Sequence, residues 1–149
     1  MIQVHGWAEL GRLVAIRVSP WVLVATLAGW ALPPPLDFVV VALLTVVVSS
    51  WLHEGGHVAT FWRCAGRADS AYIRSAWGLA LSVRVSDPVR FRRRVALGGP
   101  LPVAGLGLVM ATGAAIASSS VLAGASAALL VHGLGTLPGS SDGNRIWNL

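Results

Sequence analysis

The fold and the chemistry of this sequence depend most on residues 49–62, which read SSWLHEGGHVATFW. His53 and His57 are four residues apart, so on a helix their side chains project from one face, one turn apart. At this spacing two imidazoles can bind one zinc ion, and Glu54 beside them can take a proton from a metal-bound water. The pattern therefore predicts a helix that carries a metal site.

The composition around this stretch is typical of a membrane protein. Of the 149 residues, 55% are hydrophobic and 11% are charged, and the mean hydropathy is +0.71. A soluble domain has about 25% charged residues. By length we expect one domain, residues 1–149, with a lipid bilayer as its solvent. Ionisable side chains are costly at membrane depth and usually mark function there, which strengthens the metal-site interpretation.

Four apolar stretches are long enough, or nearly so, to cross about 30 Å of hydrocarbon. They cover about residues 13–32, 38–62, 95–117 and 121–137. The first is interrupted by Arg17 and Pro20, so residues 11–19 also fit an extended segment that leads into a shorter helix. A cleaved signal peptide is a further alternative, but the prolines at 33–35 make a poor cleavage context. We expect a retained transmembrane helix.

The segment between the second and third stretches predicts a small β element. From residue 79 to residue 86 apolar side chains alternate with small or polar ones, which is the period of a half-buried strand. The two sets are Leu79, Leu81, Val83 and Val85, and Ala80, Ser82, Arg84 and Ser86. Residues 72–75 can form a partner strand across a turn near Trp77–Gly78, with an ordinary connecting loop as the alternative. The predicted fold class is an α-helical integral membrane protein with about four transmembrane helices and a membrane-associated β element between the second and third.

All eleven basic residues are arginines, and eight of them lie within residues 63–94. A basic segment between apolar runs is typical of a cytoplasmic loop and not of a nucleic-acid interface, so we expect no nucleic-acid partner. The remaining arginines flank the first and last apolar stretches, and the other two connections have none. The positive-inside rule then places both termini in the cytoplasm. We expect a multi-pass protein of the cell membrane.

A catalytic zinc usually takes a third protein ligand and keeps one position for water. Cys64 is the only cysteine, which excludes an intrachain disulfide and a cysteine-based zinc site. Asp69 and Asp87 lie among arginines, with which we expect them to pair, and His132 is expected to make a polar contact between helices. Asp142 follows the fourth stretch and reaches the same depth as the histidines, with a solvated Asp-Gly turn as the alternative.

Three motifs together resemble the site-2 proteases, a family of intramembrane zinc metalloproteases. HEGGH within an apolar span is similar to their HExGH form, and LGGPL at 97–101 is similar to their Gly-Pro signature. LPGSSDGNR at 137–145 is similar to their Pro-containing Asp-Gly motif. The stretch LGRLVAIRVSPWVLV at 10–24 resembles the subgroup that contains the stage IV sporulation protease.

The resemblance implies a zinc metalloendopeptidase reduced to a minimal catalytic core. Its substrates would be membrane-tethered proteins, cut in or near their transmembrane segments. It implies one zinc ion per chain held by His53, His57 and Asp142, with Glu54 as the general base. The family also has a small sheet after the motif helix, which agrees with the alternation at 79–86. Such a strand can hold an unwound substrate by strand addition.

Several residues depart from the family or leave its implications open. Val103 and Gly135 stand near the places of two usual asparagines, and Ser141 replaces a usual leucine, so a catalytically impaired protein that binds partner helices is the main alternative. Gly55 and Gly56 either leave bare backbone for a substrate or permit close helix packing. A membrane metal enzyme acting on lipids needs more clustered histidines than four scattered ones, and a soluble metalloprotease disagrees with the composition.

Overall fold

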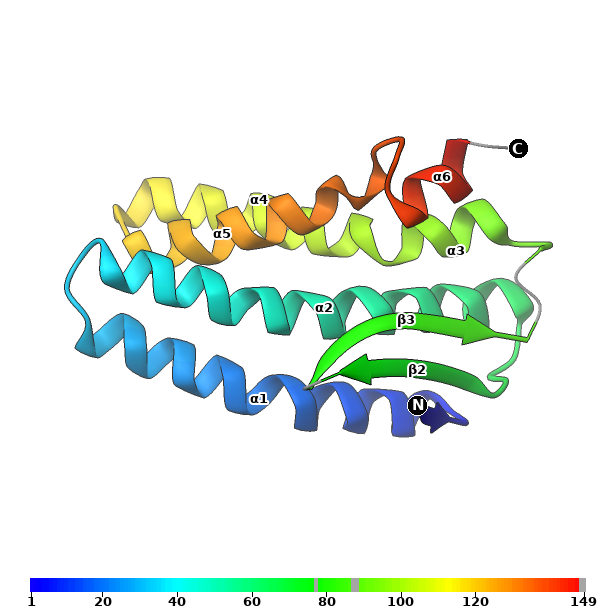
Figure 1. Cartoon of the computed structure of the whole chain (residues 1–149). Helices are drawn as coiled ribbons and strands as arrows, with labels where there is room; N and C mark the ends of the chain where they lie inside the picture. Colours follow the sequence, from blue (N-terminus) through cyan, green and yellow to red (C-terminus); the bar gives the residue numbers. More distant parts are fainter. Residues whose placement is uncertain (77, 87–88, 148–149) are drawn as a thin grey trace.

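A computed structural model describes residues 1–76, 78–86 and 89–147 of the chain (Figure 1). Most of these residues are helical, and a small antiparallel sheet lies along one side. The helices are α1 (Trp7–Ala31), α2 (Leu36–Ala65), α3 (Arg92–Gly98), α4 (Pro100–Ala117), α5 (Ser120–Gly133) and α6 (Ser141–Trp147), with a 3-10 turn, η1 (Leu134–Thr136), before α6. The strands are β1 (Ile2–Val4), β2 (Ala71–Ala76) and β3 (Leu79–Val85).

Within the described residues, three helical segments are long and apolar enough to cross a membrane: α1, α2, and α3 together with α4. The count rises to four if α5 with η1 and α6 form one span, bent by 42°. The first predicted stretch is helical throughout, including Arg17 and the interior Pro20, so the alternative of an extended segment at 11–19 is wrong. The helices predicted at the first three stretches are therefore confirmed, with α1 and α2 longer than their apolar cores, whereas the fourth stretch contains the shorter helix α5 followed by η1.

Helix α2 occupies the middle of the bundle, between α1 on one side and α4 and α5 on the other (Figure 1). Seven of its twelve buried residues recur every fourth residue, so consecutive members of the series, such as His53 and His57, lie one turn apart on the same side of the helix. The series is Asp37, Val41, Thr45, Ser49, His53, His57 and Phe61. Both histidines therefore belong to the face that packs against the neighbouring helices, and they cannot be solvated surface groups.

The chain enters the sheet directly after the end of α2. Gly66 takes a left-handed conformation (φ 72°), which ends the helix and turns the chain into β2. The strand order is β1-β2-β3 and both pairs are antiparallel. Strands β2 and β3 confirm the predicted β element, whereas β1 is an additional strand from the start of the chain that sequence patterning missed. Sheet residues such as Ile73 and Val85 pack into a core with Trp51 and Val58 of α2.

The alternation predicted for β3 is broken by a bulge. Arg74 pairs with Ser82 and Ser75 with Ala80, so Leu81 is the extra residue. As a result Ala80 is buried and Leu81 is 53% exposed. The predicted alternation is therefore wrong at these two residues. Of the predicted turn near Trp77–Gly78, Trp77 lies outside the described residues, and Gly78 has a left-handed conformation (φ 81°).

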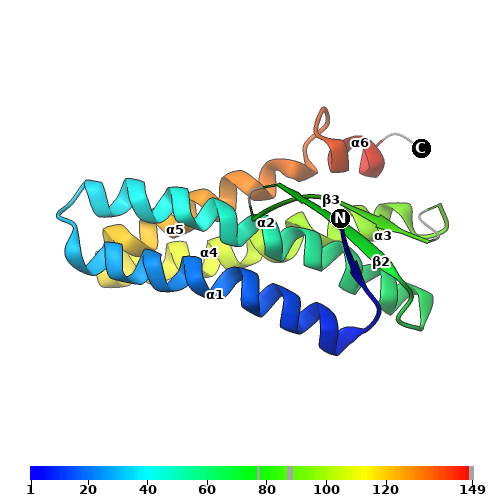
Figure 2. The ribbon, with the colours of Figure 1, turned by 60° about the horizontal axis from the view of Figure 1, so that its bottom comes forward.

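Tryptophan side chains of α2 hold the sheet in place. The indole N–H of Trp51 donates a hydrogen bond to the carbonyl of Gly78, and that of Trp62 donates to the carbonyl of Asp69 at 2.7 Å. Each end of β2 is thereby tied to α2. Both termini, the sheet, α3 and α6 lie at one end of the bundle, and the α1–α2 and α4–α5 connections lie at the other (Figures 1 and 2). This agrees with the alternating direction that was predicted for the helices.

Candidate metal centre

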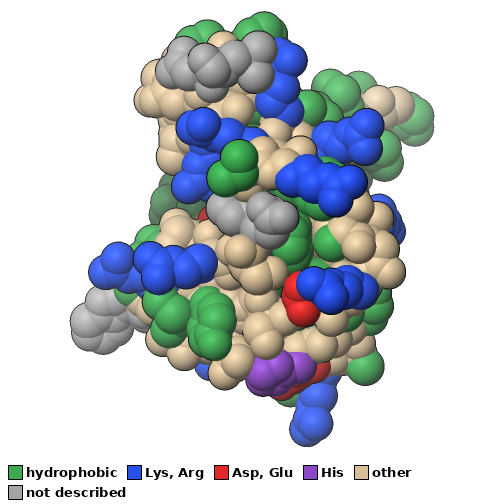
Figure 3. All heavy atoms as spheres, turned by 90° about the vertical axis from the view of Figure 1, so that its right-hand side faces the viewer, with side chains coloured by type: hydrophobic (Ala, Val, Ile, Leu, Met, Phe, Trp, Pro, Cys, Tyr) green, Lys and Arg blue, Asp and Glu red, His purple; other side chains and the backbone are tan. Residues whose placement is uncertain are grey.

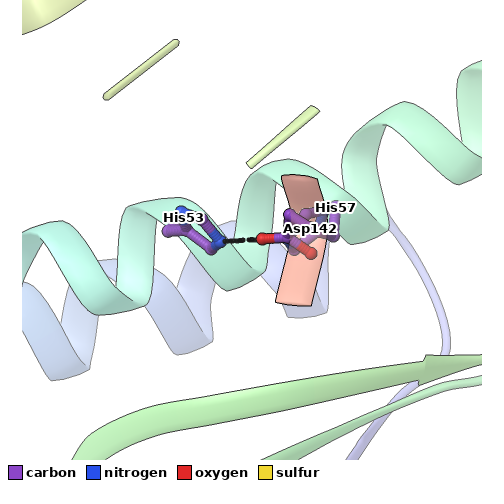
Figure 4. A group of neighbouring side chains, drawn as sticks. All are labelled: His53, His57 and Asp142. Atoms are coloured by element: carbon purple, nitrogen blue, oxygen red, sulfur yellow. Dashed lines mark hydrogen bonds and ion pairs between the residues drawn. The ribbon is translucent and has the colours of Figure 1, made fainter. Parts of the chain in front are cut away.

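Helix α2 positions the first two predicted ligands. His53 and His57 are 6% and 4% exposed, and both rings project from the same face of the helix toward the C-terminal part of the chain (Figure 4). Their ring centroids are 4.7 Å apart and the planes are nearly perpendicular, at 82°. The Nε2 atoms of the two rings are 3.0 Å apart. The four-residue spacing therefore brings together the two ring nitrogens, as the sequence predicted.

The short helix α6 delivers Asp142. The hydroxyl of Ser140 accepts the N–H of Gly143 at 2.8 Å and thus caps the start of the helix, while Asp142 lies in its first turn. A side chain at Gly143 would collide with the carbonyl oxygen of Leu137, so glycine is required for the turn to close. At the other end of α6, Arg93 of α3 donates to the carbonyl of Ile146 at 2.9 Å.

The three predicted ligands converge on one point (Figure 4). Oδ2 of Asp142 lies 2.9 Å from Nε2 of His53 and 3.3 Å from Nε2 of His57. Zinc bound tetrahedrally by nitrogen and oxygen at about 2.1 Å separates its ligand atoms by roughly 3.4 Å, so the observed distances fit one such ion with little adjustment. Asp142 is 6% exposed, which excludes the alternative of a solvated turn. The buried group His53, His57 and Asp142 can hold a metal ion.

A hydrogen bond to the backbone of α3 orients the ring of His57. Its Nδ1 lies 2.6 Å from the carbonyl oxygen of Val95 in α3, so Nδ1–H donates and a neutral ring directs the lone pair of Nε2 toward Asp142. Metal-bound histidines usually have such a partner for their other nitrogen. Nδ1 of His53 is buried and has no hydrogen-bond partner among the described residues. The two ligands are therefore held differently, His57 by a hydrogen bond and His53 by packing.

The glycines of LGGPL make room for the histidines. A side chain at Gly99 would lie 2.5 Å from Nε2 of His57 and 2.9 Å from Cδ2 of His53. One residue earlier, a side chain at Gly98 would collide with Thr60 of α2. The break between α3 and α4 thus lets the backbone approach both α2 and the rings, which explains the role of this motif in the structure.

The other two motif glycines serve packing. A side chain at Gly56 would collide with the carbonyl oxygen of Gly98, and one at Gly55 would lie 3.2 Å from Val14 of α1. Both positions face neighbouring helices. Of the two interpretations given above, close helix packing is confirmed, and the idea that these glycines leave bare backbone for a substrate is wrong.

Glu54 is 8% exposed and lines a cavity of about 380 Å³ together with all three members of the group. Residues of β3, including Ala80 and Ser82, line the same cavity, as does Arg145 of α6. The predicted base thus lies at the predicted ligands, with open space beside it. Sequence patterning missed the contributions of Val95 and Gly99, although the Gly-Gly-Pro motif was a signal for the second.

Among the described residues, the other two candidate ligands, His132 and Asp69, do not join the group. Nδ1 of His132 lies 2.7 Å from the hydroxyl of Ser49, which makes it the polar contact between helices that we expected, although its ring also lies 4.8 Å from that of His53. Asp69 pairs with Arg67 at 3.2 Å, also as expected. Asp87 lies outside the described residues.

Comparison of the chain with protein-family models, with curated proteins and with solved structures gives no significant match.

Proposed function

We propose that this chain is an intramembrane zinc metalloprotease of the site-2 protease type. The observation that carries the proposal is the convergence of His53, His57 and Asp142 beside Glu54 in one cavity. His53 and Asp142 are 89 positions apart in the chain, so their meeting is a property of the whole fold. A carboxylate and two neutral imidazoles with one open side are the ligand set of many catalytic zinc sites.

A membrane location is supported by the apolar surface of the helices. In α1 no residue of the most apolar window is buried within the chain, and Leu23 and Trp30 are 61% and 93% exposed. Exposed apolar surface of this extent is unfavourable in water and favourable in lipid. The arginines gather at the end of the bundle that carries the metal centre, so the positive-inside rule places this end at the cytoplasmic face.

The proposed chemistry divides between the metal and the chain. When bound, zinc supplies Lewis acidity, which polarises a carbonyl group and makes water a strong nucleophile at neutral pH. His53, His57 and Asp142 hold it, and Val95 keeps Nδ1 of His57 protonated so that Nε2 stays available. The carboxylate of Glu54 accepts a proton from the attacking water and returns it to the leaving amine.

The substrate must reach this cavity in an extended form, because a helix hides its carbonyl groups in hydrogen bonds. β3 is an edge strand of the sheet and also lines the cavity at residues 80–83. An unwound segment that adds to this edge would pass over the metal centre, with main-chain hydrogen bonds to hold it. The substrate is therefore expected to be a membrane-tethered protein whose cut segment has low helix stability.

The proposal is tested in vesicles with purified chain and a single-span model substrate. Glu54→Gln should retain one zinc per chain and lose cleavage, whereas Asp142→Ala should lose both, because one removes the base and the other a ligand. Asp69→Ala is the matched control, since it removes a carboxylate outside the metal group, which pairs with Arg67 and accepts a hydrogen bond from the hydroxyl of Ser86. Full cleavage by Glu54→Gln, or a wild type without bound zinc, would refute the assignment.

A catalytically impaired protein that binds partner helices remains the second candidate, because two positions lack the polar side chains that the family resemblance leads us to expect. Val103 is 1% exposed and apolar, and the Cβ position of Gly135 faces His53 at 3.7 Å. Such a protein would capture the model substrate equally well in the wild type, Glu54→Gln and Asp142→Ala. Measured cleavage by the wild type alone decides between the two candidates.

A further inference from the structure

A large basic cavity adjoins the metal centre. It has a volume of about 550 Å³, a size typical of ligand sites, and lies between the β2–β3 hairpin, α3 and α6. Four arginines line it: Arg74, Arg84, Arg92 and Arg145. A second hollow of about 540 Å³ shares two of these arginines and adds those at 90, 93 and 94. Figure 3 looks onto this end of the molecule and shows the arginine side chains gathered across it.

This arginine-lined cavity shares part of its wall with the metal cavity. His57, Ser82, Val83 and Arg145 line both. Along β3, residues 80–83 face the metal cavity and residues 82–85 face the arginine-lined one. A chain extended along this strand would therefore pass from one cavity into the other within about two to four residues, at roughly 3.3 Å per residue.

The charge in the arginine-lined cavity is not neutralised by the residues described around it. No aspartate or glutamate is among its described lining residues. Of the described residues, Arg67 is the one arginine in an ion pair, and it lies outside this cavity. Grouping like charges on walls of low dielectric raises the local potential and attracts an anionic partner. Arginine is also the side chain best suited to carboxylates, which it can bind through two parallel hydrogen bonds.

We propose that the arginine-lined cavity binds aspartate or glutamate side chains of the substrate, about two to four residues from the bond that is cut. The proposal rests on the proteolytic function above and names a feature of its substrates. Arginines near a membrane also attract anionic lipid headgroups. An acidic peptide fits better, because the cavity adjoins the metal centre and shares the strand edge along which an extended chain would lie.

The test measures peptide binding and does not depend on cleavage. Full-length chain with Glu54→Gln and bound zinc is placed in neutral phosphatidylcholine vesicles. Two single-span peptides are compared, which differ only in a juxtamembrane flank of Asp-Glu-Asp-Glu or Asn-Gln-Asn-Gln. The acidic peptide should bind on the order of ten-fold more tightly, as expected for one or two exposed charge-assisted pairs, and the preference should fall with added salt.

Substitutions of arginines test whether the preference for the acidic peptide comes from the arginine-lined cavity. Arg74→Gln with Arg84→Gln should reduce the preference to near unity, whereas the control pair Arg12→Gln with Arg67→Gln, which removes equal charge outside the cavity, should retain it. The charge-reversed pair Arg74→Glu with Arg84→Glu should prefer a Lys-Arg-Lys-Arg flank. This gain of a new preference requires a folded protein, so it separates loss of the site from loss of the fold.

Equal affinity of the Glu54→Gln protein for both peptides would overturn the proposal. So would retention of the acidic preference by the Arg74→Gln, Arg84→Gln protein. Loss of acidic-peptide preference when phosphatidylglycerol replaces a third of the lipid, at constant salt, would assign the cavity to lipid headgroups instead. A wild type that shows the preference but never cleaves would refute the proteolytic function alone, so the two failures can be distinguished.

Discussion

The two ends of the bundle each contain a buried carboxylate at the contact between α2 and the C-terminal helices, but the two carboxylates have different partners. At the end remote from the sheet, Asp37 is 4% exposed and accepts hydrogen bonds from the hydroxyl of Ser120 and the N–H of Phe38. At the sheet end, Asp142 faces two imidazole nitrogens. Asp37 has donors of its own, whereas Asp142 meets groups that can share a cation with it. Burial alone therefore does not distinguish the two carboxylates; what distinguishes Asp142 is that its neighbours can bind a metal ion as well.

A glycine lies near each carboxylate, and the surroundings of the two glycines are more alike than those of the two carboxylates. A side chain at Gly124 would press on the carbonyl oxygen of Phe38 beside Asp37, and one at Gly143 would press on that of Leu137 beside Asp142. Both ends thus depend on backbone packed against backbone. The ends differ in what this packing supports: a hydrogen-bonded helix contact at one, and the placement of a ligand at the other.

Replacing each carboxylate by an amide should have the largest effects, and the effects on zinc binding should differ most between Asp142 and Asp37. Asp142→Asn should lower zinc affinity on the order of 100-fold or more, because even the loss of contacts outside the ligand shell costs 10–100-fold, and cleavage should be lost with it. Asp37→Asn should retain zinc and cleavage and lower the free energy of unfolding by about 1–2 kcal/mol through weakened hydrogen bonds. Zinc content by mass spectrometry and denaturant titration measure the two quantities. Equal zinc loss in both would show that the comparison is mistaken.

Gly99→Ala should produce the next largest effect. The new methyl group would lie 2.5 Å from Nε2 of His57, so the rings must move apart, and we expect zinc affinity to fall by about 10–100-fold. Gly105→Ala in α4 is the control, since nothing lies within 4 Å of its Cβ position. Competition with a chelator dye reports the affinity. Unchanged binding in Gly99→Ala would mean that the helix break tolerates a side chain and that its role here is misassigned.

Alanine substitutions at Gly124 and Gly143 test the difference between the two ends of the bundle in a second way. Gly124→Ala and Gly143→Ala should each destabilise the protein by about 1–3 kcal/mol, the usual cost of overpacking a close contact. Only Gly143→Ala should also reduce cleavage per folded molecule, because it displaces the turn that carries Asp142. Cleavage rates normalised to zinc content and to the folded fraction separate the effects. A similar fall in normalised rate for Gly124→Ala would contradict the separation of the ends.

The smallest effect is expected at His132. His132→Phe keeps an aromatic ring against His53 and removes the hydrogen bond to Ser49, so we expect a stability loss of about 1 kcal/mol and unchanged zinc stoichiometry. Ser49→Ala should reproduce the stability loss. Zinc absent from His132→Phe would make this residue a ligand and not a packing contact.

The parts of the structure that follow from local periodicity were predictable. The spacing of His53 and His57, the apolar runs and the alternation near residues 82–85 each reflect the geometry of a single element. The approach of Asp142 to the histidines was expected from depth and from the family resemblance, but local pattern alone also allowed a solvated turn. What excludes that turn is packing, through the cap at Ser140 and the contact of Gly143.

The errors lie where tertiary contacts overrule local pattern. β1 has only three residues and pairs with β2 across about seventy positions, so no periodicity marks it. The bulge at Leu81 reverses the alternation because the register changes at Ser75, which no single strand encodes. Gly55 and Gly56 were ambiguous because their neighbours, Val14 and Gly98, come from other helices.

The placement of Asp142 on α6 has a consequence for biogenesis. His53 and His57 are synthesised early, yet Asp142, the third proposed ligand, leaves the ribosome some 85 residues after His57. During that interval the nascent protein has two imidazoles but lacks the carboxylate that would complete the set. Under the proposed function, metal loading would follow the docking of α6 against α3, where Arg93 donates to the carbonyl of Ile146. Under the proposed function, a chain that ends before α6 would lack the carboxylate of Asp142 and would not cleave peptide bonds.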